Sequence, residues 1–324
     1  MRAFFWDSLI EEHLHYEVEQ VHVLTALYGV ACGNLTSAHH LNVAKSLELL
    51  KAGTLIVDDF LDQAPMRNGL PSVYSQKGPE AAVMIGEVFH STALIEFCRA
   101  VEAIKPEVTG QAVCLFEETY RAVCLGQLED RELQEKVLTH DAPTEADYFT
   151  MIKHTSAVFI QAPLLLAAIL VGRPAEIVDA LAKYGLKIGL AYQVRDDILD
   201  VVATPQLTGK PRAGDIRNRK KRLPLLRLRD ACSDGEREHL LSLLNKKGTL
   251  DEVAVAEVIG MMEKHGSVES CKVTTANLCT EALAAVRGKL PGEELAQLET
   301  IAGLLTDFTC LTETERRQTV STPR

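Results

Sequence analysis

The spacing of apolar residues is the feature that most constrains how this 324-residue chain can fold. Over long stretches these residues recur every three or four positions, as on one face of an α-helix, and no convincing run alternates with the period of a β-strand. One stripe extends from about Pro174 until Pro205 ends the pattern, and a second runs from about Leu41 through Leu61 and is closed by Pro65. The sequence therefore predicts an all-α protein.

Pro and Gly residues punctuate these stripes and separate roughly ten or more predicted helices. No Gly/Ser-rich linker, low-complexity tract or internal repeat divides the chain. We therefore predict a single helical domain over residues 1–311. The tail at 312–324, TETERRQTVSTPR, is polar and lacks an apolar stripe, so we predict that it is disordered.

Composition argues against two classes of protein. The chain has 34 Lys and Arg against 45 Asp and Glu, a formal net charge of −11. Such a balance disfavours nucleic-acid binding, because neutralising phosphates requires a basic surface. Hydrophobic residues make up 47% of the chain and charged residues 24%, which excludes global disorder.

Cysteine usage and hydropathy indicate the compartment. The eight cysteines form no CxxC pair and no ligand-like cluster with histidine, as is typical of a reduced cytosolic protein. The most continuous apolar stretch, residues 162–171, is too short to span a bilayer, and the first twenty residues are too acidic for a signal peptide. We expect a soluble, cytoplasmic protein without a transmembrane segment.

Two aspartate clusters with the same DDxxD spacing are the strongest functional signal. They are Asp58, Asp59 and Asp62 in LIVDDFLD, and Asp196, Asp197 and Asp200 in YQVRDDILD. On a helix the first and last Asp of each cluster share one face. An exposed charged face is the competing explanation, but like charges four residues apart destabilise a helix, and carboxylates on apolar helices are costly to desolvate. Ligand sets made of oxygen alone favour Mg²⁺ with a bound phosphate.

Basic residues follow each cluster in predicted loops. Arg67 follows the first cluster in MRNG, and Lys210 and Lys220 follow the second in LTGKPRAGDIRNRKKRLP. Basic loop residues are often merely solvated, yet here they recur in the same place after both clusters. The sequence therefore predicts that these three residues bind a diphosphate.

The combination of motifs resembles the trans-isoprenyl diphosphate synthase family, also called polyprenyl synthetases, from about residue 16 to 305. The resemblance is carried by LIVDDFLDQAPMRNGLPS, LGQLED, IKHTSAVF, GLAYQVRDDILD and LTGKPRAGDIRNRKKRLP. It implies an all-helical fold around a central cavity, and ionisation of an allylic diphosphate held by three Mg²⁺ ions. It also implies a homodimer.

The resemblance assigns roles to individual residues. The implied metal ligands are Asp58, Asp59, Asp62, Asp196 and Asp200, with Asp197 behind them. Arg67, Lys210 and Lys220 would hold the diphosphate, and Thr155 and Gln193 would direct oxygen dipoles toward the allylic cation. His154 stands where the family usually has Lys, and it would still donate to phosphate when protonated. Smaller departures include Arg219 for a Gly and Arg222 for a Thr.

Most departures fall on the site for isopentenyl diphosphate, the homoallylic partner. The residues that stand for its usual Lys, Arg, His and Arg are Glu19, His22, Lys51 and Asn68. Glu19 would repel a diphosphate, whereas Lys51 compensates in part. The allylic half of the pattern is therefore nearly whole, and the homoallylic half is dismantled.

The family also relates substrate length to the residues four and five positions before the first motif, which here are Thr54 and Gly53. Their small size favours a long substrate such as farnesyl or geranylgeranyl diphosphate, with Lys51 and Thr54 on the substrate-facing side.

Three functional hypotheses remain open from the sequence. The leading one is Mg²⁺-dependent ionisation of a long allylic diphosphate without isopentenyl diphosphate, with the cation cyclised, quenched by water or transferred to another acceptor, as in a terpene synthase or a prenyltransferase. The second is ordinary chain elongation through a rebuilt isopentenyl diphosphate site. The third is a regulatory subunit of an active synthase, which the intact aspartates disfavour.

Overall fold

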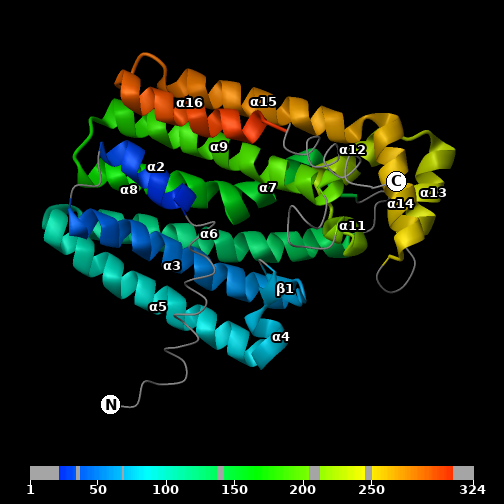
Figure 1. Cartoon of the computed structure of the whole chain (residues 1–324), viewed down its shortest axis with the longest axis horizontal. Helices are drawn as coiled ribbons and strands as arrows, with labels where there is room; N and C mark the ends of the chain where they lie inside the picture. The colour runs from blue at the N-terminus through cyan, green and yellow to red at the C-terminus, as the bar shows by residue number, and fades with distance from the viewer. Residues whose placement is uncertain are drawn as a thin grey trace, which may run out of the picture. The chain divides into compact units, whose positions relative to one another are not determined.

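The computed structural model describes residues 22–33, 37–67, 69–136, 142–203, 212–244 and 250–308. Nearly all of the regular structure in these ranges is helical, which confirms the all-α prediction (Figure 1). Glu19, Asn68 and Lys210, the side chain of His22, and the tail predicted to be disordered lie outside the residues described.

The chain's contacts group into two compact units. The first lies within Met1–Cys124, Val158–Leu186 and Ala285–Gln297, and the second within Leu125–Ala157, Lys187–Ala284 and Leu298–Arg324. Three helices belong to both units: α6 (Thr109–Glu135), α9 (Ala175–Val202) and α16 (Gly292–Thr306), while α15 (Ser267–Val286) lies almost entirely in the second.

The first unit also contains α2 (His22–Cys32), α3 (Ala38–Leu61), α4 (Val73–Lys77), α5 (Pro79–Ile104), the short 3₁₀ turn η1 (Pro106–Val108) and α8 (Val158–Leu170). The second unit contains α7 (Glu145–Ile152), the π-helical turn η2 (Lys153–Ala157), α11 (Gly214–Arg217), α12 (Leu223–Ala231), α13 (Asp234–Leu244) and α14 (Glu252–His265).

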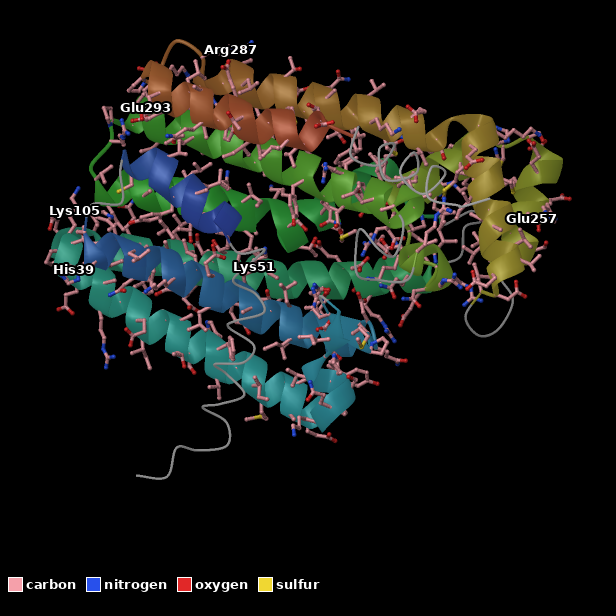
Figure 2. The ribbon with its side chains drawn as sticks, in the orientation of Figure 1. His39, Lys51, Lys105, Glu257, Arg287 and Glu293 are labelled. Carbon is pink, nitrogen blue, oxygen red and sulfur yellow. The ribbon has the colours of Figure 1, made fainter. Side chains whose placement is uncertain are left out.

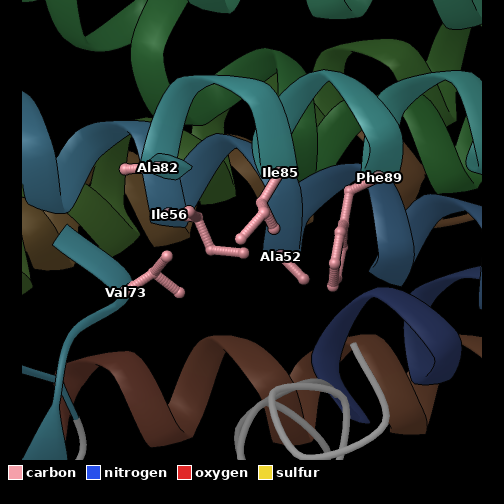
Figure 3. Packing of buried hydrophobic residues seen from close by; sticks show 6 residues of the cluster. All are labelled: Ala52, Ile56, Val73, Ala82, Ile85 and Phe89. Atoms are coloured by element: carbon pink, nitrogen blue, oxygen red, sulfur yellow. The ribbon is translucent and has the colours of Figure 1, made fainter. Parts of the chain in front are cut away.

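In the first unit α3 and α5 pack closely side by side (Figure 1). A Cβ atom on Gly53 of α3 would lie 2.8 Å from Cβ of Phe89, and one on Gly86 of α5 would lie 2.5 Å from Val57. Beside these two glycines, apolar side chains from both helices and α4 form a buried cluster, shown in Figure 3: Ala52, Ile56, Val73, Ala82, Ile85 and Phe89. The glycines let the two backbones approach, and the cluster removes apolar surface from water.

A two-stranded antiparallel hairpin follows α3, formed by β1 (Met66–Arg67) and β2 (Leu70–Pro71). Its strands have two residues each, too few for a period-two pattern to mark them in the sequence. Gly69 in the turn has φ +82°, a conformation that glycine adopts without a steric penalty. The hairpin fixes the position of Arg67 soon after the first aspartate motif.

In the second unit two glycines allow helices to approach the π turn. A Cβ on Gly126 of α6 would lie 2.7 Å from the backbone nitrogen of Thr155, and one on Gly189 of α9 would lie 2.4 Å from Cα of Ala157. Gly126 belongs to the LGQLED stretch, and Gly189 to the stretch that leads into the second motif. π turns occur frequently at functional sites, and this one carries His154 and Thr155.

Two helical stretches, Pro79–Ile104 and Glu145–Leu170, are long and apolar enough to cross a membrane. Length and composition alone are weak evidence, because core helices of soluble proteins meet the same criteria. Of the most apolar window in the second stretch, 56% is buried inside the protein, as expected for a core helix.

Candidate active site

The first aspartate motif occupies the last turn of α3. Asp59 is buried, with 5% of its side chain exposed, whereas 25% of the Asp58 side chain is exposed. The helix ends at Leu61, so Asp62 is its C-cap residue, and the Asp62 N–H donates to the carbonyl of Asp58. The stripe and Pro65 therefore predicted this helix end correctly, and the motif lies where α3 gives way to the hairpin.

Arg67 contacts two carboxylates of this motif. Its Nε donates to both oxygens of Asp59 at 2.9 and 2.8 Å, and its Nη2 lies 3.2 Å from Oδ2 of Asp58. The guanidinium therefore compensates the charge of the buried Asp59 and neighbours the more exposed Asp58. Its predicted contact with a diphosphate stays a prediction.

Upstream of this motif, α3 carries Lys51, Gly53 and Thr54. Lys51 and Thr54 are half-buried, and the Thr54 hydroxyl donates to the carbonyl of Lys51 at 2.8 Å (Figure 2 labels Lys51). Gly53 faces Phe89 and Gly86 of α5, so packing between the two helices is enough to require its small size. Of these two small residues, only Thr54 is then left as an indication of a long substrate.

The second motif lies near the end of α9, where its two outer residues differ in exposure. Asp196 is exposed, whereas Asp200 is partly buried and accepts hydrogen bonds from the backbone N–H groups of Gly214 and Asp215, both at 3.1 Å. Burial raises the pKa of Asp200 to about 8, and the charges of Asp215, Asp196 and Asp197 add to the effect. A carboxylate in such surroundings favours either a proton or a cation.

Asp197, the middle residue of this motif, is buried at 1% exposure. The Tyr148 hydroxyl donates to its Oδ2 at 2.5 Å, and Gln193 Nε2 donates to its Oδ1 at 2.9 Å. Burial raises the pKa of Asp197 to about 7, although the Arg222 guanidinium opposes the increase. Tyr148 and Gln193 therefore hold this carboxyl in one orientation behind the two outer aspartates.

Arg222 lies among three acidic residues of the second unit. Its Nη1 and Nη2 donate to the two oxygens of Asp130 at 2.7 and 3.1 Å, and its Nε lies 3.5 Å from Asp215 and 3.9 Å from Asp197. Burial raises the pKa of Asp130, but the charges of Arg222 and Lys220 lower it by more, to below its usual value. This arginine connects the LGQLED stretch of α6 to the second motif of α9.

The basic stretch before α12 is held by backbone carbonyls and by Asp215. Lys220 is buried, with its Nζ 3.8 Å from Asp215 Oδ1. Lys221 Nζ donates to the carbonyls of Gln134 and Arg219, both at 2.9 Å, and burial lowers the pKa of this lysine to about 8. The structure thus places Lys220 near the second motif, within the same group of charges as Arg222.

The π turn positions His154, which replaces the usual Lys of the family. Its Nδ1 lies 2.9 and 3.0 Å from the two carboxylate oxygens of Glu129 on α6. The side chain of His154 is 29% exposed and that of Glu129 is 35% exposed. Because Nδ1 is directed at Glu129, Nε2 is the ring nitrogen that can contact an anion.

The side chains of Thr155 and Gln193 form hydrogen bonds with neighbouring groups. The Thr155 hydroxyl donates to the carbonyl of Met151 at 3.1 Å, and Ser156 donates its hydroxyl to Gln193 Oε1 at 2.5 Å. Because Gln193 Nε2 binds Asp197, both ends of this amide are fixed. The predicted contact of Thr155 and Gln193 oxygens with an allylic cation stays a prediction.

Several residues that complete this arrangement were not predicted from the sequence. Asp130 and Arg222 were visible as charges, but their pairing joins residues far apart in the chain. Tyr148 and Asp215 carried no signal, because a tyrosine on an apolar stripe and an aspartate in a basic loop are both ordinary.

Comparisons with known proteins identify the family of this chain. A family model of polyprenyl synthetases matches residues 20–262. The chain is 34% identical over 227 residues to a short chain isoprenyl diphosphate synthase of Methanothermobacter thermautotrophicus, covering 70% of this chain and 67% of that protein. It is 31% identical over 268 residues to a geranylfarnesyl diphosphate synthase of Natronomonas pharaonis, covering 82% and 74%.

Solved structures show the same fold. A geranylgeranyl pyrophosphate synthase from Corynebacterium glutamicum, complexed with isoprenyl diphosphate and magnesium, superposes with a TM-score of 0.79 at 23% identity. The match covers 92% of this chain and 90% of that one. With a family model over most of its length and relatives above 30% identity, the chain belongs to the polyprenyl synthetase family.

Proposed function

We propose that this protein is a Mg²⁺-dependent prenyltransferase that ionises an allylic diphosphate and joins the resulting cation to isopentenyl diphosphate. The observation that carries the proposal is the burial of Asp200 beside Asp215 and Asp196 in the second unit: burial first, and then these neighbouring charges, raise the pKa of Asp200 to about 8. Carboxylates packed in this way stay ionised when a cation neutralises them.

The residues present fit magnesium. Asp58 is partly exposed and Asp196 is exposed, so both offer carboxylate oxygens, and within the described residues no group of three or more potential ligands joins a His or Cys to them. Oxygen ligands of this kind, completed by water and substrate phosphate, are typical of Mg²⁺. The Corynebacterium glutamicum relative was crystallised with magnesium and an isoprenyl diphosphate, which supports the same choice here.

We propose that Asp58 and Asp62 in the first unit, and Asp196 and Asp200 in the second, are Mg²⁺ ligands, and that Asp59 and Asp197 support them from buried positions. Bound Mg²⁺ supplies Lewis-acid stabilisation of the charge that accumulates on the departing diphosphate. Arg67, Lys210 and Lys220 supply positive charge for a diphosphate, and His154 donates a hydrogen bond to it when protonated. Thr155 and Gln193 present fixed oxygen dipoles that favour the allylic cation.

The relatives change the order of the hypotheses drawn from the sequence. Those compared above carry the names of elongating synthases, which favours chain elongation over ionisation without isopentenyl diphosphate. The observation that still supports the second candidate is the replacement of basic residues by Glu19 and Asn68. In the elongation proposal Lys51, half-buried on α3, provides positive charge for isopentenyl diphosphate.

The test is product analysis with purified protein, Mg²⁺, and farnesyl or geranylgeranyl diphosphate, with and without isopentenyl diphosphate. Elongation predicts a longer linear prenyl diphosphate that forms only when isopentenyl diphosphate is present. Diphosphate release that is unchanged by isopentenyl diphosphate would favour the second candidate. Activity that persists in EDTA would contradict both.

A matched set of variants separates catalytic from structural roles. Asp58→Ala and Asp196→Ala each remove a solvent-accessible carboxylate without opening a core cavity, so we expect kcat/KM to fall at least about a hundredfold with helical circular dichroism unchanged. Lys183→Ala removes a charge of an exposed surface pair and serves as the control, with activity expected to stay at the wild-type level.

We also propose that the protein is a homodimer. Apolar side chains at Met84, Val88 and Ile95 of α5 are 63%, 44% and 51% exposed, and their spacing puts them on one face of the helix. Exposed apolar faces of this kind often mark interfaces, and most homo-oligomers are two-fold dimers. Light scattering should report a dimer that Met84→Glu weakens, whereas Val253→Glu, at another exposed site, should leave it intact.

A further inference from the structure

A second group of potential metal ligands lies in the second unit, where α12, α13 and α14 meet. Cys232 follows α12, Glu236 lies in the first turn of α13, and His265 is the last residue of α14. One ligand atom from each, Cys232 Sγ, a Glu236 oxygen and a His265 ring nitrogen, lies within 4.8 Å of the other two. The mixture of sulfur, nitrogen and oxygen differs from the aspartate motifs, whose ligands are oxygen alone.

From this convergence of a thiol, a carboxylate and an imidazole we propose that these three residues bind a Zn²⁺ ion, with a water molecule as the fourth ligand. Zn²⁺ is the common biological ion that accepts this combination of ligands, in tetrahedral sites. Mg²⁺, the metal proposed for the aspartate motifs, disfavours both sulfur and nitrogen ligands. The proposal does not depend on the function proposed above.

Two of the ligands already have the required separation. Glu236 Oε1 lies 3.2 Å from His265 Nε2. Ligands about 2.0–2.1 Å from a zinc ion at the tetrahedral angle lie about 3.3 Å from each other, and sulfur lies about 3.6 Å from either. The Cys232 sulfur, which is within 4.8 Å of both, therefore has to come at most about 1.2 Å closer to each of them.

The second oxygen of Glu236 fixes the carboxylate. Ser233 donates its N–H and its hydroxyl to Glu236 Oε2, at 3.0 and 2.7 Å, as the N-cap of α13. Oε1 is then left to face His265. Capping of α13 accounts for the contact between Glu236 and Ser233. It does not account for the approach of the buried Cys232 and of His265 to the same carboxylate.

Lys264 is the group that competes for this position. Its Nζ lies 2.5 Å from Glu236 Oε1, and 68% of its side chain is exposed. The ammonium shows that the position attracts a cation, and an exposed lysine can swing into water when a divalent ion binds. Arg237, the other nearby cation, donates instead to the carbonyls of Arg229 and Cys232.

Zinc binding requires the Cys232 thiol to release its proton. Burial and the Glu236 charge raise the pKa of this thiol in the absence of metal, so binding is expected to strengthen as pH rises. The bound ion would join the end of α12 to the end of α14. α12 directly follows Lys220 and Arg222, so the zinc would stabilise the helix that anchors these two residues.

The test uses full-length protein without a histidine tag, kept in excess Mg²⁺ so that the aspartate motifs remain loaded. Titration with Zn²⁺ should show one equivalent bound and raise Tm by about 3–8 °C at saturation. Titration with Co²⁺ should produce a thiolate-to-cobalt charge-transfer band, which the aspartate motifs cannot produce because they contain no sulfur.

Cys232→Ser should abolish the cobalt band, and His265→Gln should weaken zinc binding at least about tenfold. Two controls match these changes. Cys279→Ser alters another buried cysteine, and His239→Gln removes a histidine that pairs with Glu257 without a cysteine; both should leave the titrations unchanged (Figure 2 labels Glu257). If wild-type protein gives no cobalt band, or if the band survives in Cys232→Ser, the assignment is wrong.

Discussion

The two aspartate motifs have the same DDxxD spacing but different surroundings. In the first, Asp59 is compensated by one arginine, Arg67, from the hairpin that directly follows. In the second, Asp197 is held by Tyr148 and Gln193 and lies near Arg222, groups that come from three helices or their caps.

This difference teaches that one spacing can be used in two ways. The first motif is a local arrangement at the end of α3, where the compensating charge is 19% exposed. The second is part of a buried network that also ties α6 to the start of α12 through Asp130 and Arg222. Changes at the first should mainly affect ligand binding, whereas changes at the second should affect folding more strongly.

The largest expected effect is on stability, from Arg222→Ala. This change leaves Asp130 and Asp197 buried without their main positive charge, and we expect the free energy of unfolding to fall by about 3–5 kcal/mol. Arg67→Ala leaves the buried Asp59 without its guanidinium, but at a more exposed helix end, and should cost less, about 1–3 kcal/mol. Urea unfolding followed by circular dichroism measures both. Equal losses would remove the distinction between the motifs.

The next effect is on the pH dependence of stability in metal-free protein. The pKa of Asp200 is about 8 in the folded chain against 3.8 for an ordinary aspartate, so above pH 4 the folded state holds a proton that the unfolded state has released. Stability should therefore fall between about pH 4 and pH 8, by about 2–4 kcal/mol.

Mg²⁺ should reverse this trend, because metal binding requires the ionised carboxylate and strengthens as pH rises. Asp200→Asn should make the metal-free profile shallower, with the remaining fall coming from Asp197, whose pKa is raised to about 7, while Asp58→Asn in the first motif should leave the profile in place. Unfolding free energies at several pH values, with EDTA and with Mg²⁺, provide the measurement. A profile that rises with pH in EDTA would show that Asp200 is ionised without metal.

Substrate binding should depend on the basic residues that are proposed to contact the diphosphate. Arg67→Ala and Lys210→Ala should each weaken binding of an allylic diphosphate by about 1.5–3 kcal/mol, the scale of a charge-assisted hydrogen bond. Isothermal titration with a non-hydrolysable allylic analogue in Mg²⁺ measures this. Unchanged affinity in both variants would mean that the diphosphate binds elsewhere.

The smallest effect concerns Tyr148→Phe, which removes one hydroxyl from the second network. Asp197 loses a buried donor but keeps Gln193, so we expect a loss of about 1–2 kcal/mol in the free energy of unfolding. A control is Tyr74→Phe, which alters a tyrosine whose ring lies at a tilt beside Phe60, with the centroids 5.8 Å apart, near the first motif. If the two variants lose the same stability, the Tyr148 hydroxyl has no special role.

Much of the local structure followed from the sequence. The apolar stripes and their closing prolines predicted α3 to about residue 61 and α9 from about residue 174, and the structure has Ala38–Leu61 and Ala175–Val202. The DDxxD spacing marked the six aspartates as candidate ligands that share a helix face, because helical periodicity is a property of neighbouring residues. The motifs and the residues between them also identified the family.

Tertiary packing decided the rest. Only the fold buries Asp59 and Asp197 while leaving Asp196 exposed, brings Arg222 to Asp130, and sets Gly53 against Phe89. Each of these depends on residues distant in sequence that approach within a few ångströms. A periodic pattern determines which face of a helix is apolar, but the burial of a charge and its pKa depend on which other elements pack against that face.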